Sequence, residues 1–363
     1  MIPVFSRKFD KNDIKYVKKT LQNNWVSSNG PFSKKLKEEV KKFFKTKYVS
    51  LTSSGTTALE CALKAAGVKS GDEVIIPAFT IVSCLNVVLK FGAKPIIVDV
   101  DKDTWLILEK EILSHITKKT KAVMLVHIFG NCFDVLSLKK KINKKIIIIE
   151  DCAEAIGAKI NGKYVGTIGD IGTYSFYSNK TITSGEGGMV LTNNKNLHNT
   201  VENYSNLFFG KKERFDHSDI GYNYRLGDMQ CALAYSQIKK FNNNINKLNV
   251  VAKKYKKYLN NDLIKFQKNN KCKSVWWMIA IILPDHILAN KLMTFLKSKN
   301  VETRNLFKPL NQMKFLKIDK KKCKNSNYLY NHGLYLPSGY DLRLNQIIKI
   351  SHLVNKFVLS NSK

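Results

Sequence analysis

Arginine is scarce in this sequence, although the chain is strongly basic. The 363 residues carry 61 lysines and arginines against 28 aspartates and glutamates, a formal net charge of +33. Only five of these basic residues are arginine: Arg7, Arg214, Arg225, Arg304 and Arg343. Proteins that read nucleic acids use arginine at base edges and phosphates and cluster their charge, whereas lysine here is spread along the whole chain. We therefore interpret the charge as a solvated basic surface that favours anionic ligands, and expect no nucleic-acid partner.

Signals for membrane insertion or export are missing as well. No segment reaches the roughly 18 apolar residues that span a bilayer. The first residues, 1–8, contain no apolar core of signal-peptide length. We expect a cytoplasmic protein without membrane contact.

Clustered metal or disulfide ligands are also absent from the sequence. The seven cysteines are odd in number and scattered, with no Cys-x-x-Cys pair, and the seven histidines are equally dispersed. This pattern is typical of neither a disulfide framework nor a zinc site, so we expect no metal.

Continuous apolar runs dominate the first two thirds of the chain. Strands are predicted at 72–77, 94–100, 120–127 and 145–151, with helical patterns between them. Uninterrupted apolar strands are typical of a parallel sheet that is covered on both faces by helices. The βα repeat therefore predicts an α/β doubly wound domain, with ligands bound beyond the carboxyl ends of its strands.

The last third has a different organisation. A polar run, 239–249, follows the apolar stretch 220–238 and predicts a long helix that leads into a smaller C-terminal domain. There we expect a strand at 276–283, a helix at 289–299 and an exposed loop at 317–327. The predicted domains are 1–240, including the N-terminal segment, and 241–363.

Small and hydroxyl residues follow the strand predicted at 48–51 and open a helix. In the segment Ser53 to Leu59, Gly55 and Thr56 stand at the helix start. Free N–H groups at such a helix N-terminus bind phosphate. A plain Ser/Thr helix cap is the alternative interpretation.

An aspartate ends the strand of four isoleucines. Asp151, in the segment Glu150 to Ala155, is expected at the carboxyl edge of the sheet beside apolar walls, where a carboxylate needs a partner. A protonated pyridine nitrogen is one such partner. A cap for the following turn explains Asp151 equally well.

One lysine differs from the others in its surroundings. Lys180 lies between a predicted strand and the glycine-rich turn 185–188, flanked by small and hydroxyl residues. A half-buried lysine amine can form a Schiff base with a carbonyl compound. The glycines lack the Gly-Lys-Ser/Thr order of a Walker loop, so we interpret them as a turn.

The segment Gly221 to Gln230 is polar and aromatic and precedes an apolar helix. It retains Arg225, one of the few arginines in a lysine-rich chain. Arginine at this point suggests a specific bidentate or charge-paired contact. A structural ion pair is the alternative.

Taken in this order, the four motifs resemble those of the DegT/DnrJ/EryC1/StrS family of pyridoxal 5′-phosphate (PLP) sugar aminotransferases. The likeness runs nearly end to end and includes 25–31, 103–105, 126–130 and 336–338. Within the family, the segments 150–155 and 179–188 are most similar to those of GDP-perosamine synthases. The resemblance implies aminotransferase fold type I, with a mostly parallel large domain and a smaller C-terminal α+β domain.

The resemblance also implies a reaction. Glutamate would supply an amino group to the 4-keto carbon of a nucleotide-linked 4-keto-6-deoxyhexose, with PLP as cofactor. The nucleotide is GDP, or alternatively UDP or dTDP as in viosamine-type synthases. A PLP-dependent sugar dehydratase and a non-catalytic basic binding protein are the remaining alternatives.

Cofactor contacts follow from the resemblance residue by residue. Lys180 matches the lysine that binds PLP covalently and serves as general acid and base. Asp151 matches the aspartate that keeps the pyridine nitrogen protonated. Ser175 and the backbone at Gly55 and Thr56 match the phosphate site.

Further matches concern the substrate and a second subunit. Glu154 lies where the family has a Gln or Glu beside the phenolic oxygen of the cofactor. Asn223, as a cofactor contact, and Arg225, as a substrate contact, match a segment that usually reaches the neighbouring subunit, which implies a homodimer with shared active sites. His127, at the end of its predicted strand, is a candidate substrate contact, and a core or capping histidine is the alternative.

Two positions bear on how closely the chain follows the family. Many relatives stack an aromatic side chain on the cofactor at the position of Ile81, so that either Phe79 or an aliphatic surface would take this role here. Relatives that catalyse 3-dehydration carry histidine in place of the lysine. Lys180 therefore favours amino transfer, and it also argues against a non-catalytic relative.

Overall fold

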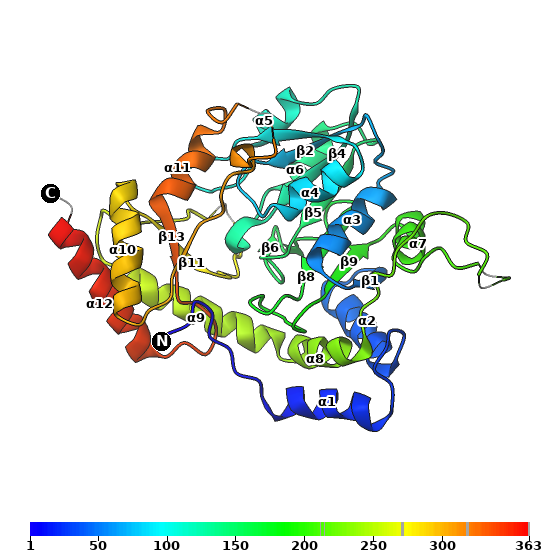
Figure 1. The fold of residues 1–363 in the computed structure, drawn as a ribbon, viewed down its shortest axis with the longest axis horizontal. Coiled ribbons are helices and arrows are strands. Elements are labelled where there is room, and N and C mark those ends of the chain that lie inside the picture. The colour runs from blue at the N-terminus through cyan, green and yellow to red at the C-terminus, as the bar shows by residue number, and fades with distance from the viewer. Residues whose placement is uncertain (211, 214, 270–271, 317–318, 362–363) are drawn as a thin grey trace.

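The computed structural model describes residues 1–210, 212–213, 215–269, 272–316 and 319–361. A seven-stranded sheet forms its centre, in the order β1-β9-β8-β5-β4-β2-β3 (Figure 1). The neighbours from β8 to β3 pair in parallel, whereas β9 is antiparallel to both β8 and β1. The sheet contains β1 (Tyr48–Thr52), β2 (Glu73–Pro77), β3 (Lys94–Val98), β4 (Thr120–Val126), β5 (Ile147–Asp151), β8 (Ile171–Ser175) and β9 (Gly188–Thr192).

Helices cover both faces of this sheet. Successive strand residues such as Ile75 and Ile76 enter opposite hydrophobic cores, which explains why the strands are continuously apolar. One core includes α2 (Pro31–Phe44), α6 (Val135–Lys141) and α8 (Asp228–Lys239). The other includes α3 (Gly55–Ala65), α4 (Ser83–Lys90) and α7 (Lys195–Tyr204). The remaining elements here are α1 (Lys11–Gln22), α5 (Glu109–Ser114) and the hairpin of β6 (Lys159–Ile160) with β7 (Lys163–Tyr164).

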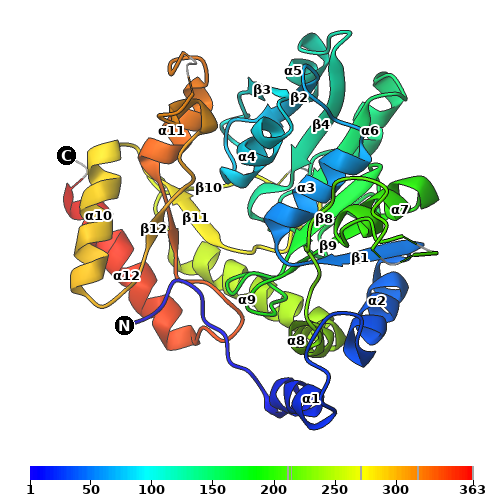
Figure 2. The ribbon, with the colours of Figure 1, turned by 45° about the vertical axis from the view of Figure 1, so that its right-hand side comes forward.

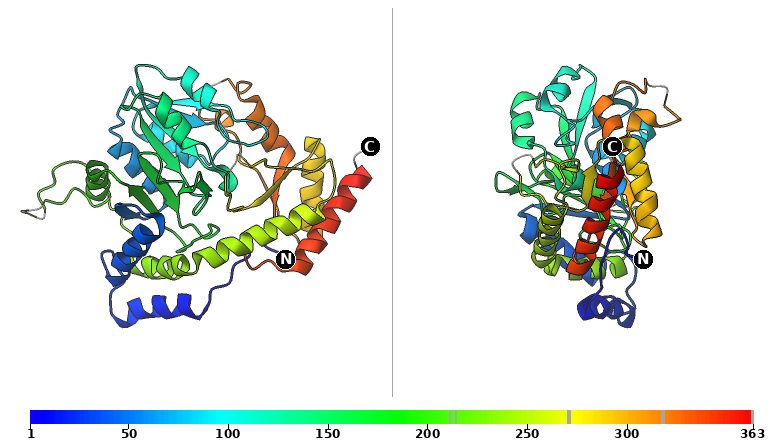
Figure 3. Two further views of the ribbon diagram at one scale, coloured as in Figure 1. Left: turned by 180° about the vertical axis from the view of Figure 1, so that it is seen from behind. Right: turned by 90° about the vertical axis from the view of Figure 1, so that its left-hand side faces the viewer.

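A long helix leads from the large sheet to a smaller one. Helix α9 (Phe241–Tyr258) starts directly after the predicted domain boundary and runs along one side of the molecule (Figure 3). The smaller antiparallel sheet lies beside the large one (Figure 2) and has the order β10-β11-β13-β12. Its elements are β10 (Lys265–Phe266), β11 (Ile279–Ile282), β12 (Arg304–Asn305), β13 (Gly333–Leu336), α10 (His286–Ser298), α11 (Lys324–His332) and α12 (Leu344–Asn361). The predicted fold class, a mostly parallel α/β part with a smaller C-terminal α+β part, is confirmed.

The loop predicted at 317–327 is wrong in its second half. Positions 317 and 318 lie outside the described residues, and helix α11 begins at Lys324. Its N-terminal N–H groups are held by a distant carboxylate, because Asp99 accepts hydrogen bonds from the backbone of Asn325 at 2.8 Å and Ser326 at 2.9 Å. A cap supplied from more than two hundred residues away leaves no local sequence signal.

The N-terminal segment lies against the small sheet and not only against the large part. Ile2 pairs with Val301, and Phe5 pairs with Ser338, in short parallel bridges. The domain bounds 1–240 and 241–363 remain a prediction. Across the described ranges, no helix combines the length and apolarity that crossing a bilayer requires.

Candidate active site

A cavity of about 460 Å³ opens beyond the carboxyl ends of three neighbouring parallel strands. Val126, Asp151 and Ser175, the last residues of β4, β5 and β8, all line it. The start of α3 and side chains from the small sheet complete the wall. This is the edge at which α/β sheets bind ligands. Six of the nine predicted site residues line the cavity: Gly55, Thr56, Asp151, Glu154, Ser175 and Lys180.

Lys180 lies in the loop after β8 and directs its amine into this cavity. Its side chain is 12% exposed, and Nζ lies 3.6 Å from Glu154 Oε1. On another side, Nζ lies 4.0 Å from the centre of the Trp277 ring. A carboxylate and an aromatic face both attract an ammonium group, so the amine is held at one place in the cavity.

Glu154 is itself fixed by the neighbouring strand connection. Its Oε2 accepts a hydrogen bond from the backbone N–H of Phe129 at 2.9 Å. Burial raises the pKa of Glu154 above its usual value, although the positive charge of Lys180 opposes the shift. The carboxyl group therefore combines a fixed position with a high proton affinity next to the Lys180 amine.

Asp151 is a buried carboxylate at the end of β5. Its Oδ1 accepts the N–H of Ala153 at 3.0 Å, and its Oδ2 accepts the thiol of Cys84 at 3.3 Å. Burial raises the pKa of Asp151, while these two hydrogen bonds and the charge of Lys180 lower it to a lesser degree. The turn-capping contact expected from the sequence is thus present, and a cationic ligand group would still stabilise the ionised form.

The start of α3 forms a small cradle opposite Asp151. Ser54 caps the helix and accepts the N–H of Thr57 at 3.1 Å, which leaves the first N–H groups, those of Gly55 and Thr56, without a partner in the helix. A Cβ atom at Gly55 would lie only 2.8 Å from Ser175 Cβ and 3.2 Å from its Oγ. Glycine therefore lets the helix start approach the Ser175 hydroxyl, and together they present donors to an anion.

Asn223 and Arg225 lie outside this cavity. Asn223 pairs with Asn206 in a short antiparallel bridge, and Arg225 Nη1 donates to Asn206 Oδ1 at 2.8 Å. Arg225 lines a separate hollow of about 50 Å³. The same segment contacts the residues that precede the cradle, because Ser53 donates its N–H to the carbonyl of Tyr224 at 2.7 Å.

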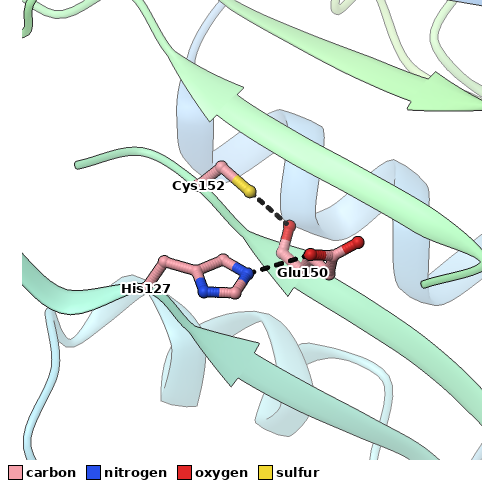
Figure 4. Close-up of side chains that lie close together, drawn as sticks. All are labelled: His127, Glu150 and Cys152. Atoms are coloured by element: carbon pink, nitrogen blue, oxygen red, sulfur yellow. Dashed lines mark hydrogen bonds and ion pairs between the residues drawn. The ribbon is translucent and has the colours of Figure 1, made fainter. Parts of the chain in front are cut away.

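His127 is fully buried, does not line the cavity either, and lies beside Glu150 and Cys152 (Figure 4). Its Nδ1 accepts the backbone N–H of Phe133 at 3.2 Å, so Nε2 carries the proton that it donates to Glu150 at 2.9 Å. The geometry corresponds to the core histidine of the alternative interpretation. The substrate contact of His127 stays a prediction.

The same place holds a group of three potential metal ligands. One ligand atom each of His127, Glu150 and Cys152 lies within 4.8 Å of the others. Burial raises the pKa of the Cys152 thiol well above its ordinary value, whereas a metal needs the thiolate. The two Glu150 oxygens already accept backbone N–H groups as well. Such a donor set fits a hydrogen-bonded core, and the expectation of no metal stays a prediction.

Several cavity residues escaped the sequence analysis. Trp277, Arg304 and Tyr335 reach the cavity from the small sheet, about a hundred residues or more after Lys180. Of the two alternatives for the surface that would contact a ring in the cavity, Phe79 does not line the cavity, because this residue is 1% exposed and packs on Trp105. Ile81 lines the cavity instead and presents an aliphatic surface.

Comparisons with known proteins agree with this geometry. The sequence model of the DegT/DnrJ/EryC1/StrS aminotransferase family matches residues 7–355. The GDP-perosamine synthases of Escherichia coli O157:H7 and Vibrio cholerae are 36% and 34% identical to the chain over 98% of its length, and the matches cover 98% and 99% of those proteins. The crystal structure of the aminotransferase TlmJ from Streptoalloteichus hindustanus is similar in fold, with a TM-score of 0.94, 20% identity and 100% of both chains covered.

Proposed function

This chain belongs to the DegT/DnrJ/EryC1/StrS family of PLP-dependent sugar aminotransferases, and from that premise we propose a specific reaction for it. Glutamate supplies an amino group to the 4-keto carbon of a GDP-linked 4-keto-6-deoxyhexose, as in a GDP-perosamine synthase-like enzyme. The observation that carries the proposal is the meeting of Lys180, Glu154 and Asp151 in one cavity. The 34–36% identity with two GDP-perosamine synthases supports the choice of nucleotide.

The cavity residues fit PLP on their own chemistry. Asp151 is a buried carboxylate whose raised pKa marks the lack of a cationic partner, and a protonated pyridine nitrogen supplies one. The cradle of Gly55, Thr56 and Ser175, which a larger side chain at 55 would fill, suits a phosphate group. When bound, PLP supplies the electron sink for a carbanion on the amino donor.

The protein's own contribution is to hold groups in place and to move one proton. Lys180 Nζ would carry a proton from the donor's Cα to the cofactor in the first half of the cycle, and from the cofactor to C4 of the sugar in the second half. Glu154, 3.6 Å away, keeps the amine at the reacting position. Asp151 keeps its negative charge opposite the ring nitrogen, which favours the protonated ring on which carbanion formation depends.

A lysine at position 180 favours amino transfer over 3-dehydration. An amine next to a carboxylate can both bind a carbonyl compound covalently and shuttle a proton, and amino transfer needs both. The alternative substrates, UDP- and dTDP-linked 4-keto-6-deoxyhexoses, carry a different nucleotide. They are therefore the matched competitors in the assay.

The assay combines the purified PLP-loaded protein, glutamate and a panel of GDP-, UDP- and dTDP-linked 4-keto-6-deoxyhexoses. We expect a 4-amino-4,6-dideoxy product by mass and NMR, with kcat/KM for the GDP sugar at least about tenfold above the others, a difference of about 1.4 kcal/mol. Lys180→Ala is the control that should form no product. A preference for UDP or dTDP sugars would contradict the nucleotide assignment, and a deoxygenated product without nitrogen would contradict amino transfer.

The working unit proposed here is a homodimer with shared active sites. Asn223 and Arg225 lie outside their own chain's cavity, on a segment whose Tyr224 carbonyl accepts the N–H of Ser53, just before the cradle. In a two-fold dimer such a segment can reach the partner's site, and the exchange is reciprocal. The two residues would then contribute amide and guanidinium donors to an anionic group there.

A further inference from the structure

The N-terminal segment reaches the loop that carries Lys180. Arg7, which precedes α1, donates from Nη1 to the carbonyl of Ser178 at 3.1 Å. Its Nη2 donates to the carbonyls of Lys180 and, at 3.3 Å, Thr181. One guanidinium therefore binds the backbone on both sides of the active-site lysine.

A second side chain completes the hold on this loop. Trp277 donates from Nε1 to the carbonyl of Asn179 at 2.7 Å, while its ring lies 4.0 Å from Lys180 Nζ. Together with Arg7, it engages every backbone carbonyl from 178 to 181. The loop has little regular structure of its own, so these contacts from distant segments define its shape.

Arg7 is held rigidly at its other end. Its Nε donates to the phenolic oxygen of Tyr340 at 2.7 Å, and Tyr340 in turn donates to Gln237 of α8 at 3.2 Å. The guanidinium also lies 5.2 Å from the centre of the Phe5 ring. Burial lowers the pKa of Arg7 from its ordinary value, and an arginine side chain in a protein remains a charged donor at neutral pH.

The residue type supports a specific role. The chain uses lysine for nearly all its positive charge, yet it has arginine at this position. An ammonium group cannot reach four acceptors in a fixed plane, whereas the guanidinium fork can. The acceptors are three uncharged carbonyls and a phenol, so geometry and not ion pairing explains the arginine.

We propose that Arg7 is a positioning residue for Lys180. It fixes the loop backbone so that Nζ stays between Glu154 and Trp277, at the point where the proton must be moved. The proposal rests on the proposed catalytic role of Lys180. It predicts that loss of the fork disturbs the lysine without removing the binding groups for phosphate or sugar.

The test compares Arg7→Lys and Arg7→Met with Arg343→Met, which removes an exposed arginine that is not among the residues lining the cavity. Both Arg7 variants should lower kcat at least tenfold and leave KM for the keto sugar within about threefold. The pH midpoint of the PLP absorbance change, which reports the environment of the Lys180 linkage, should shift. In the cofactor-free protein, amides of 176–184 should exchange hydrogen faster. Arg343→Met should match wild type in all four measurements.

Two results would overturn the proposal. Wild-type exchange rates at 176–184 in a folded Arg7 variant would show that the fork does not fix the loop, and an unchanged pH midpoint with unchanged kcat would show that it does not position the amine.

If Arg7→Met fails to fold, Arg7→Lys and Tyr340→Phe, which removes the Nε acceptor, give the same comparison with a smaller expected effect. Borohydride labelling of wild type with PLP separates the two hypotheses: label away from Lys180 would overturn the proposed function, whereas label on Lys180 leaves these outcomes to decide the role of Arg7.

Discussion

His127 donates its Nε2 proton to Glu150 Oε2 across 2.9 Å in a fully buried part of the molecule. Glu150 also accepts the backbone N–H groups of Gly166 at 2.8 Å, Ile168 at 2.9 Å and Gly169 at 2.6 Å. These residues form the connection that leads into β8 and on to Lys180. The pair thus fixes, inside the protein, the segment that leads into β8 and to the loop that carries Lys180.

Glu150→Gln should destabilise the fold by roughly 3 kcal/mol, because hydrogen bonds to a buried carboxylate are strong and an amide would turn a donor toward other donors. Urea denaturation measures the free energy of unfolding. Glu38→Gln is the matched control, since Glu38 forms an exposed pair with Lys41, and it should cost at most about 1 kcal/mol. Equal stability of the two variants would contradict the anchoring role.

The same carboxylate makes stability depend on pH. Burial acts to raise the pKa of Glu150, but hydrogen bonds from His127 and the backbone outweigh it, and the pKa lies below its ordinary value. A depressed pKa stabilises the fold fully above the unfolded value of about 4.3 and loses this contribution as pH falls through the folded value. The stability gap between wild type and Glu150→Gln should therefore narrow below about pH 4.

Borohydride reduction with bound PLP should place the label on the peptide that contains Lys180. The expectation rests on the amine's place in the cavity beside Glu154, where it is 12% exposed among 56 lysines that are mostly on the surface. Peptide mass mapping identifies the site, and Lys180→Ala should abolish both the label and turnover. Label on another lysine would overturn the assignment.

Asp151→Asn should separate catalysis from stability. The amide keeps the oxygen that accepts the Ala153 N–H but loses the charge that favours a protonated ring, so kcat should fall roughly 100-fold or more. A steady-state assay at saturating sugar measures this effect. Near-normal turnover would mean that Asp151 acts only as a cap.

Without PLP, Asp151→Asn should be more stable than wild type at neutral pH. Burial raises the pKa of Asp151, so its ionised form opposes folding above the folded pKa and does not do so below the unfolded one. The thermal midpoint of cofactor-free Asp151→Asn should exceed that of wild type by about 2 °C at pH 8, and the difference should shrink as pH falls. Saturating PLP should reverse the order. If Asp151→Asn is less stable than wild type at pH 8 without PLP, this result contradicts the interpretation that Asp151 lacks a cationic partner in the cofactor-free protein.

Complementation tests the shared site. Lys180→Ala should be inactive alone and Arg225→Ala only weakly active, and co-refolding them should restore about a quarter of wild-type activity, given random pairing of two chains. Half of the dimers are then mixed, and each mixed dimer has one intact site of two. Native mass spectrometry confirms the mixed dimers. No recovery in their presence would place Arg225 in its own chain's site, and an active monomer would reject sharing altogether.

The pattern of the apolar strand predicted that Asp151 stands at the carboxyl edge of the sheet, whereas Ser175 was named only through the family resemblance. Asp151 and Ser175 end neighbouring strands, so the topology alone brings them to one edge of the sheet. Trp277 was visible only as part of a strand, and nothing near Arg7 indicates that its partners are carbonyls at 178–181. Contacts between segments that far apart depend on how the small sheet docks, which no local periodicity encodes. For the same reason, the sequence did not predict that Asp99 caps α11.

The pairing of Ile2 with Val301 and of Phe5 with Ser338 determines when the N-terminal segment can dock during synthesis. Residues 2–5 leave the ribosome well before Val301 and Ser338, so they stay unpaired until these partners have been translated. Arg7 can engage the Lys180 loop only once that segment is in place, since both belong to the same extended stretch. The large sheet can form earlier, whereas the lysine loop receives its final shape only after Val301 and Ser338 have been made.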